Sequence, residues 1–313
     1  MSIEYRSLND LSACIRGALH RIPTDIDLIV GVPRSGLLAA NMMALHLNLP
    51  LADLDSFLEG RVLSSGFRFR DSHQFPKYQR ALVLDDSVAT GNQINEIRDR
   101  LERQGLRERC LLGAVYMAPG KESLVDLYLE TVPEPRMFEW NFMAHYLLPT
   151  ACVDIDGVLC RDPTEAENDD GLAYERFLAE VEPLFRPRRK IGWLVTSRLE
   201  KYRQLTEDWL GKHDIEYDQL MMLDLPSKKA RQEQKAHGTF KASVFTTTKS
   251  SVFIESTQWQ AEVIASRAGK PVLSIEGQQM INPGEWQVQR ARVTRAPILL
   301  VQRLGRALRW QSS

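Results

Sequence analysis

Two adjacent carboxylates, Asp85 and Asp86, directly follow the apolar run Ala81–Leu84. Small residues with Thr90 and Gly91 come next and lead into a helical pattern. Carboxylates placed in this way can accept hydrogen bonds from vicinal ribose hydroxyls or approach a divalent cation through water. Unpaired N–H groups at a helix N-terminus attract a phosphate. The alternative is a plain acidic turn that caps a helix. The sugar-phosphate site predicted here consists of Asp85, Asp86, Ser87, Val88, Ala89, Thr90, Gly91 and Asn92.

A second loop with phosphate-binding character lies earlier in the chain. It follows the apolar run Leu28–Val30 and precedes a helical pattern over Leu37–Leu47. Arg34 can bind two phosphate oxygens through parallel hydrogen bonds. Taken alone, the loop is equally an ordinary strand-to-helix turn, and its position upstream of the acid pair favours a phosphate site. The binding residues predicted here are Val32, Pro33, Arg34, Ser35 and Gly36.

A second acidic motif, Asp154-Ile155-Asp156-Gly157, ends the apolar run that begins at Ala151. Two carboxylates two residues apart in an extended chain point the same way, so they can share a metal ion and a phosphoryl group. One can attack phosphorus while the other handles the leaving-group proton, and Mg²⁺ offsets their mutual repulsion. A calcium loop is the competing interpretation, but Gly157 comes too early for it and an apolar strand precedes the acids.

The elements that must position these residues form two successive α/β series. β-Branched runs alternate with amphipathic helical patterns, which is typical of helices layered on a parallel sheet. The first series has predicted strands at Leu28–Val30, Ala81–Leu84, Leu111–Met117 and Val125–Leu129, and helices over Leu37–Leu47 and Asn92–Gln104. The second has predicted strands at Ala151–Ile155, Ile191–Val195, Val252–Ile254 and Pro271–Ile275. We therefore expect two Rossmann-like domains, residues 1–147 and 148–285, followed by a basic tail, residues 286–313.

Composition excludes several classes of protein. A chain of 313 residues has room for about two domains of ordinary size. Its 40 basic and 41 acidic residues give a net charge of -1, which argues against a nucleic-acid partner. No apolar run approaches the roughly 18 residues of a membrane span, and no secretory signal is visible near the start. The four cysteines lack CxxC spacing, as expected for reduced thiols in a cytoplasmic protein.

The first series resembles the type I phosphoribosyltransferases, in which an apolar strand, two acids, small residues, Thr-Gly and a helix occur in this order. The resemblance implies phosphoribosyl diphosphate (PRPP) as substrate, bound with Mg²⁺. It also implies that the loop around Arg34 binds the leaving diphosphate. The basic stretch Leu58–Arg80 would be a mobile loop that closes over PRPP, and a solvated basic hairpin is the alternative.

The second series resembles the haloacid dehalogenase (HAD) phosphatases. The resemblance implies that Asp154 and Asp156 are catalytic and that Thr196 and Ser197, after Ile191–Val195, bind the phosphoryl group. It implies a further lysine, for which we choose Lys241 over its rivals Lys235 and Lys249, and a metal site formed by Asp154, Asp156 and Glu255. The sequence departs from the family because Ser256, not a second acid, follows Glu255. Residues 161–190 would form a small cap, in which the turn at 168–171 is substrate-facing or simply solvated.

Together the two halves are similar to fused phosphoribosyltransferase–HAD proteins that install β-ribofuranose in bacterial polysaccharides. The resemblance implies transfer of 5-phosphoribosyl from PRPP to a glycan acceptor, followed by removal of the 5-phosphate. A nucleobase phosphoribosyltransferase fused to a nucleotide phosphatase is the first alternative. A PRPP-sensing regulatory protein is the second.

The C-terminal tail contains six arginines and no acid from Trp286 onward. Apolar residues recur at near-helical spacing between them, which predicts a basic amphipathic helix. Such a helix either packs on a domain or lies on an anionic surface at the inner face of the membrane, beside a lipid-linked acceptor.

Overall fold

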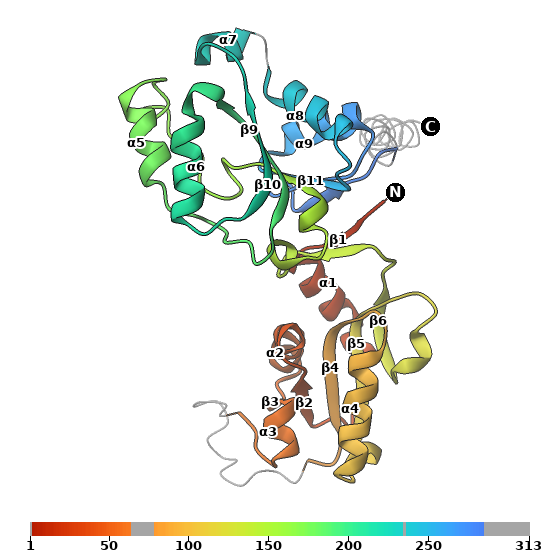
Figure 1. Cartoon of the computed structure of the whole chain (residues 1–313). Helices are drawn as coiled ribbons and strands as arrows, with labels where there is room; N and C mark the ends of the chain where they lie inside the picture. The colour runs from red at the N-terminus through yellow and green to blue at the C-terminus, as the bar shows by residue number, and fades with distance from the viewer. Residues whose placement is uncertain (1, 64–77, 234–235, 285–313) are drawn as a thin grey trace, which may run out of the picture. The chain divides into compact units, whose positions relative to one another are not determined.

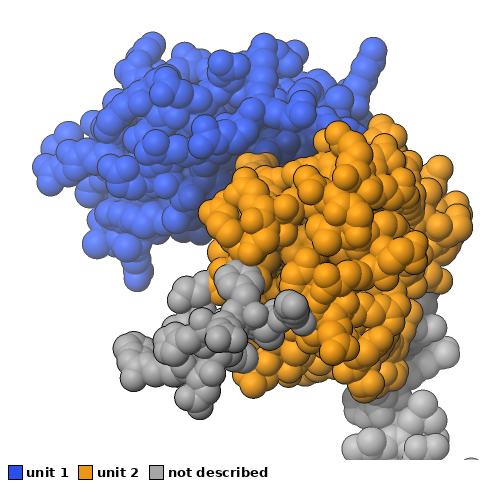
Figure 2. All heavy atoms as spheres, turned by 90° about the horizontal axis from the view of Figure 1, so that it is seen from below, with its two compact units in different colours: residues 1–3, 141–313 blue, residues 4–140 orange. Residues whose placement is uncertain are grey.

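The computed structural model describes residues 2–63, 78–233 and 236–284. The predicted basic tail and the centre of the Leu58–Arg80 loop lie outside these ranges. Contacts divide the chain into an N-terminal unit, Glu4–Trp140, and a C-terminal unit, Met1–Ile3 with Asn141–Ser313 (Figure 2). The division precedes the boundary expected at 147 because Phe142 already packs edge-on against Phe185, with ring centroids 5.0 Å apart.

The N-terminal unit is built on a five-stranded parallel sheet with the order β3-β2-β4-β5-β6. Its strands are β2 (Leu28–Gly31), β3 (Leu51–Asp53), β4 (Ala81–Val88), β5 (Cys110–Met117) and β6 (Leu127–Thr131). A separate pair of parallel strands consists of β1 (Glu4–Arg6) and β7 (Arg136–Phe138). The strand order reverses between β2 and β4, and open α/β sheets bind ligands at the carboxyl ends of the strands at such a point.

Helices cover both faces of this sheet (Figure 1). The helices α1 (Leu8–Ala18) and α2 (Ser35–Leu47) pack on one face, and α3 (Leu54–Leu58) and α4 (Asn92–Arg103) pack on the other. Alternate strand residues enter the two cores: Leu82 lies in the first and Val83 in the second. Burial on both faces explains why the strands are continuous apolar runs without polar alternation.

The C-terminal unit has a six-stranded sheet with the order β10-β9-β8-β11-β12-β13, which is parallel except for the last pair. Its strands are β8 (Ala151–Val153), β9 (Ile191–Leu199), β10 (Tyr217–Leu223), β11 (Val252–Glu255), β12 (Val272–Ser274) and β13 (Gln279–Ile281). Here the order reverses between β8 and β11. The acids Asp154 and Glu255 therefore lie at the second reversal point.

The described helices of this unit form two pairs and one short segment (Figure 1). The α5 helix (Leu172–Glu180) packs on α6 (Arg203–Lys212), and α8 (Ala236–Thr247) packs on α9 (Gln258–Ala268). The short α7 (Lys228–Glu233) precedes α8. Short 3₁₀ turns occupy Leu19–Arg21, Arg107–Arg109, Glu122–Leu124, Phe142–Ala144, Leu148–Thr150 and Glu200–Tyr202.

The predicted α/β fold with parallel sheets is confirmed, but two strands are longer than expected. β4 continues to Val88 and carries the acid pair within the strand, because its pairing with β5 continues through Asp85 opposite Ala114 and Val88 opposite Met117. Ser87 and Val88 therefore belong to the strand and not to the following loop. β9 runs to Leu199, well beyond the predicted end at Val195. Within the described ranges, no helix combines the length and apolar character that crossing a membrane would require.

Close packing of α2 on β4 makes Gly36 sensitive to substitution. A Cβ atom there would lie 2.9 Å from Asp85 Oδ1 and 3.0 Å from both the Asp85 Cα and the Leu84 carbonyl oxygen. We expect Gly36→Ala to lower the free energy of unfolding by about 1–3 kcal/mol, since backbone atoms must move. Gly17→Ala in α1 is the control, because no atom lies within 4 Å of its added Cβ. Calorimetry of both full-length variants checks this, and equal melting temperatures would contradict it.

Candidate functional sites

The acid pair of the N-terminal unit lies buried against the loop that follows β2. Asp85 and Asp86 are each 4% exposed. The Ser35 hydroxyl donates to Asp86 Oδ1 at 2.8 Å, and the indole N–H of Trp140 donates to Asp86 Oδ2 at 2.9 Å. The structure therefore brings the two predicted phosphate-binding segments together and adds Trp140, which the sequence did not indicate.

Asp85 is buried without a paired cation in the described part of the chain. Its burial, together with the neighbouring charge of Asp86, raises the pKa of Asp85 to about 8. No ion pair to either acid occurs among the residues that the structure describes. A buried carboxyl without a cation fits a ligand that brings ribose hydroxyls or a divalent cation, so the residues present are compatible with Mg²⁺ held by Asp85 and Asp86.

The loops beside the acid pair leave polar groups accessible at two helix N-termini. Arg34 is exposed at the start of α2, and the peptide bond between Pro33 and Arg34 is cis. Thr90 is exposed just before α4. Gly91 has a φ of +90°, and a Cβ there would lie 2.3 Å from Leu124 Cδ1, so this position requires glycine. The exposed residues of the two predicted loops are Pro33, Arg34, Ala89, Thr90 and Asn92, while Val32 and Gly36 are buried.

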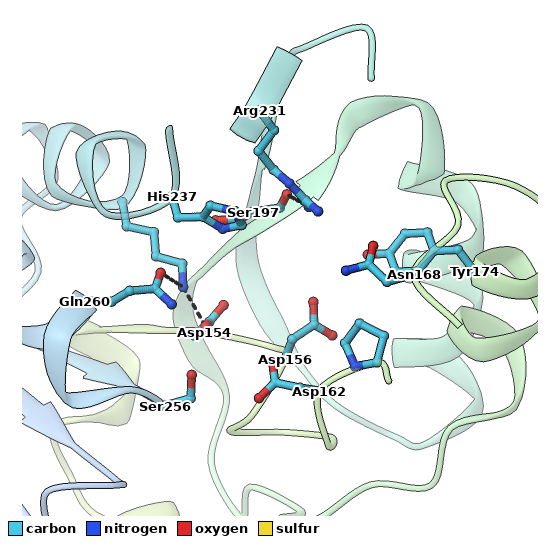
Figure 3. A pocket seen from close by; sticks show the side chains of 12 residues that line it. Asp154, Asp156, Asp162, Asn168, Tyr174, Ser197, Arg231, His237, Ser256 and Gln260 are labelled. Carbon is cyan, nitrogen blue, oxygen red and sulfur yellow. Dashed lines mark hydrogen bonds and ion pairs between the residues drawn. The ribbon is translucent and has the colours of Figure 1, made fainter. Parts of the chain in front are cut away.

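The C-terminal unit contains a cavity of about 170 Å³ at the carboxyl ends of its central strands (Figure 3). Four predicted site residues line it: Asp154, Asp156, Ser197 and Lys241. Thr196 does not line it; its buried hydroxyl accepts from the backbone N–H of Arg198. Asn168, from the turn that was expected to be substrate-facing or solvated, also lines it. Sequence analysis gave no site role to the remaining lining residues, which are Asp162, Pro163, Tyr174, Arg231, His237, Ser256 and Gln260.

Lys241 joins the ends of β8 and β11. Its ammonium donates to Asp154 Oδ2 at 2.6 Å, to Glu255 Oε2 at 2.8 Å and to Gln260 Oε1 at 3.3 Å. Burial alone would lower the pKa of Lys241, but the charges of Asp154 and Glu255 raise it above its ordinary value, so the lysine stays protonated. Of the rival lysines, Lys249 does not line the cavity, and Lys235 lies outside the described residues.

Asp156 is held by a buried arginine that sequence analysis did not assign. Arg198 Nε donates to both oxygens of Asp156 at 3.1 Å, and Nη2 donates to Oδ1 at 2.6 Å. Arg198 is 0% exposed. We expected the strand to end at Val195, which would place Arg198 beyond it, where a charged residue is ordinarily solvated. The sequence therefore gave no indication of this role. The observed strand continues to Leu199 and keeps Arg198 inside.

The three carboxylates that line this cavity outnumber its two lining cations, Lys241 and Arg231, so the residues present are compatible with a bound metal ion. Burial raises the pKa of Asp154 well above its ordinary value, although Lys241 opposes this. Burial and the charge of Asp156 also raise the pKa of Asp162. Within the described ranges no three acidic, histidine or cysteine side chains form a ready metal cluster. Of the three residues predicted to hold Mg²⁺, Asp154 and Asp156 line the cavity, where they bind Lys241 and Arg198, whereas Glu255 lies behind Lys241 with Oε1 accepting from the backbone N–H of Ser256.

Comparisons with known proteins identify the N-terminal unit. Residues 4–142 match the model of the phosphoribosyl transferase domain family. The predicted type I phosphoribosyltransferase fold of this unit is therefore confirmed, and the HAD-like assignment of the C-terminal unit stays a prediction. No curated protein sequence matches the chain.

Solved structures similar to this chain match it over less than half its length. A purine phosphoribosyltransferase from Pyrococcus horikoshii is 19% identical, with a TM-score of 0.34, and covers 45% of this chain and 94% of its own. The xanthine-guanine-hypoxanthine phosphoribosyltransferase of Helicobacter pylori is 16% identical, with a TM-score of 0.34, and covers 45% of this chain and 93% of its own.

The raised pKa of Asp85 predicts a pH dependence of stability. The folded state keeps this proton up to about pH 8, whereas an unfolded aspartate releases it near pH 4. Between these values the folded state binds more protons, so the free energy of unfolding falls as pH rises. We expect Asp85→Asn to melt at a higher temperature than the unsubstituted protein at pH 8, with a much smaller difference at pH 4.5. Asp99→Asn, on an exposed position of α4, is the control. If the melting temperatures of Asp85→Asn and the unsubstituted chain differed by the same amount at both pH values, the raised pKa of Asp85 would be contradicted.

Proposed function

We propose that the chain is a bifunctional enzyme that transfers 5-phosphoribosyl from PRPP to an acceptor and then hydrolyses the 5-phosphate. The observation that carries this proposal is the placement of buried acids at both points of strand reversal. One pair lies in a phosphoribosyl transferase domain beside a phosphate-binding loop. The other lines a small polar cavity with a lysine bound to Asp154.

In the transfer step, the bond between ribose C1 and diphosphate breaks and a bond from C1 to the acceptor oxygen forms. The acceptor hydroxyl releases its proton to water, and inversion at C1 of α-configured PRPP gives a β-ribofuranoside. Asp86 stabilises the positive charge that develops on the ribose ring, and Asp85, which holds its proton to about pH 8, can hydrogen-bond the ribose hydroxyls. Bound Mg²⁺ would neutralise the departing diphosphate. Ser35 and Trp140 fix the Asp86 carboxylate, so it needs no reorganisation during the reaction.

In the hydrolytic step, Asp154 attacks phosphorus and the bond to the ester oxygen breaks. The released alcohol takes a proton, and water then cleaves the aspartyl phosphate to return Asp154 and inorganic phosphate. Lys241 orients the nucleophile, and Arg198 orients Asp156, the carboxylate placed to handle the leaving-group proton. The Ser197 hydroxyl, buried on the wall and without a hydrogen-bond partner, is available to a phosphoryl oxygen.

The product chemistry supports a glycan acceptor. Removing the 5-phosphate would destroy a nucleotide but leaves a finished ribofuranoside on an acceptor that is being decorated. The resemblance to polysaccharide-modifying fusions points the same way, and a lipid-linked acceptor is compatible with membrane contact through residues 286–313. We therefore propose a glycan as the acceptor. We also propose that the reaction consumes PRPP at the cytoplasmic side of the membrane.

One observation favours a nucleobase acceptor as the second candidate. The half-buried ring of Trp140 stacks on Phe138, with centroids 4.8 Å apart and planes 5° apart, and its N–H binds Asp86. A planar acceptor could stack beside the same aromatic pair. Mass spectrometry after incubation with PRPP and Mg²⁺ separates the two candidates: mass gain on a glycan supports the first, and on a free base the second. A purely regulatory protein would have no need of the acids and lysine in the cavity.

Asp154→Asn should abolish phosphate release and leave diphosphate production unchanged, because the nucleophile lies in the other unit from the transferase site. The phosphoribosylated acceptor then accumulates and gains the mass of a phosphoribosyl group. Asp208→Asn, an exposed position on α6, controls for general effects of the substitution. Loss of diphosphate production in Asp154→Asn would show that the two activities are not separate.

Replacing Asp85 and Asp86 together with asparagine should lower PRPP-dependent transfer about 10³-fold, since the contact of Asp86 with the developing charge and the carboxyl of Asp85 at the ribose are both lost. Hydrolysis of a preformed phosphoribosyl substrate should continue at the unsubstituted rate. Diphosphate and phosphate are measured in parallel. A transfer rate within tenfold of that of the unsubstituted enzyme would contradict the assignment of the acid pair to the transferase site.

A further inference from the structure

We propose that Arg231 is a specificity-determining residue of the C-terminal cavity that binds an oxygen of a terminal phosphate group. The inference rests on the proposed phosphatase function for its substrate class, phosphomonoesters. Arg231 belongs to α7 and lines the cavity, and Figure 3 shows its guanidinium directed into the space between Ser197 and Asn168. Neither the sequence motifs nor the family match assigned it a role.

Arg231 is a buried cation that is paired with no carboxylate in the described part of the chain. It is 8% exposed, and its Nε has no hydrogen-bond partner among the described residues. Its Nη1 donates to the backbone carbonyl of Ser197 at 2.8 Å, which leaves the positive charge unneutralised. Among the described residues no carboxylate lies within the 4.0 Å of an ion pair with it. Burying an unpaired charge is costly, so this position is stable chiefly when an anion offsets the charge.

The other basic groups of the cavity cannot take over this role. Lys241 is already shared by Asp154 and Glu255. Burial, assisted by the charges of Arg231 and Lys241, lowers the pKa of His237 to about 4, so the imidazole is neutral at physiological pH. Within the described part of the wall, Arg231 is therefore the cation left free for an incoming anion.

Two unused donors lie side by side at this place. The Ser197 hydroxyl is buried and has no partner, like Arg231 Nε. They come from β9 and α7, which the bond from Arg231 Nη1 to the Ser197 carbonyl holds together. A phosphoryl group with several unesterified oxygens can accept from both donors at once, whereas a neutral hydroxyl cannot neutralise the guanidinium.

The turn at Asn168–Asp170 positions α7 over the cavity. Asp170 Oδ2 accepts from the backbone N–H of Lys228 at 3.0 Å, at the first residue of α7. Its Oδ1 accepts from the Tyr202 hydroxyl at 3.0 Å and from Lys201 Nζ at 2.9 Å. The Lys228 ammonium donates back to the carbonyl of Asn168. The turn thus faces the cavity through Asn168 and is no plain solvated turn.

The size of the cavity restricts the rest of the substrate. Its volume of about 170 Å³ is below the roughly 300–1,000 Å³ usual for small-molecule pockets. There is room for a phosphate group and the first atoms of its alcohol. The structure therefore assigns the cavity to phosphates at the end of a chain or ring substituent, and the larger acceptor stays outside.

The test compares Arg231→Gln with Lys229→Gln in the full chain. Both variants remove one positive charge from α7, but the Lys229 side chain is 85% exposed and away from the cavity. Binding of inorganic phosphate is titrated by calorimetry, and hydrolysis of p-nitrophenyl phosphate is measured with Mg²⁺. We expect Arg231→Gln to raise the Kd for phosphate and the KM about 10- to 100-fold, with a smaller change in kcat. Arg231→Lys should restore binding in part.

The thermal stability of the variants separates binding from a structural role. Without phosphate, Arg231→Gln should melt at or above the temperature of the unsubstituted chain, because a buried unpaired charge is removed. A lower melting temperature with unchanged Kd would make Arg231 a structural residue and overturn the inference. A Kd within twofold of the unsubstituted value, or no phosphate binding by the unsubstituted chain, would also overturn it.

The two proposals fail in different ways. If the unsubstituted chain binds phosphate through Arg231 and hydrolyses no phosphomonoester, the cavity is an anion site and the proposed phosphatase function is wrong. If it hydrolyses p-nitrophenyl phosphate and Arg231→Gln keeps the same KM, the phosphatase function stands and the role of Arg231 is wrong.

Discussion

Parallel strands whose order reverses leave a crevice at their carboxyl ends, and this constraint organises both units. The chain leaves β2 toward one face of the sheet and β4 toward the other, so the loops after them diverge and helix N-termini face the crevice. The same holds for β8 and β11. Side chains at the ends of these apolar runs lie against the hydrophobic core. Asp85 and Asp154 are therefore both buried, although they are acidic residues.

Burial at these points makes each acid costly unless something neutralises or hydrogen-bonds it. The structure meets this cost differently at the two sites. Asp86 receives neutral donors, the Ser35 hydroxyl and the Trp140 indole, and Asp85 holds its proton to about pH 8. Asp154 and Asp156 instead receive full positive charges from Lys241 and Arg198.

Much of this arrangement could be predicted from the sequence, because the decisive signals are local. Apolar runs that end in acids indicated β4 and β8, and the resemblance to known families pointed to Lys241 as the lysine beside Asp154. Strand ends were harder: the continued pairing of β4 with β5 through Val88 depends on a neighbour that is distant in sequence. Local patterns carry no information about such pairing.

The residues that sequence analysis missed share a physical reason. Trp140, Arg198 and Arg231 act through contacts with segments 34 or more positions away in the sequence. The separation is 34 between Arg231 and Ser197, 42 between Arg198 and Asp156, and 54 between Trp140 and Asp86. A lone arginine in a sequence is most often solvated, so its type alone indicates nothing. Only the fold shows that Arg198 is paired and that Arg231, which is also buried, has no carboxylate partner among the described residues.

The two sites differ in whether their acids are paired with cations, so they require different ligands. The N-terminal pair has acids without a cation, so its ligand must supply hydroxyl donors or a metal ion, as a sugar diphosphate with Mg²⁺ does. The C-terminal cavity already contains the cations that hold its acids in place, and it adds Arg231 and the Ser197 hydroxyl as donors without acceptors. These two donors favour a ligand that brings negative charge. Under the proposed function, a phosphoribosyl product of the first site would meet that requirement through its 5-phosphate and would no longer do so once the phosphate is removed, so these donors would favour release of the finished alcohol over rebinding.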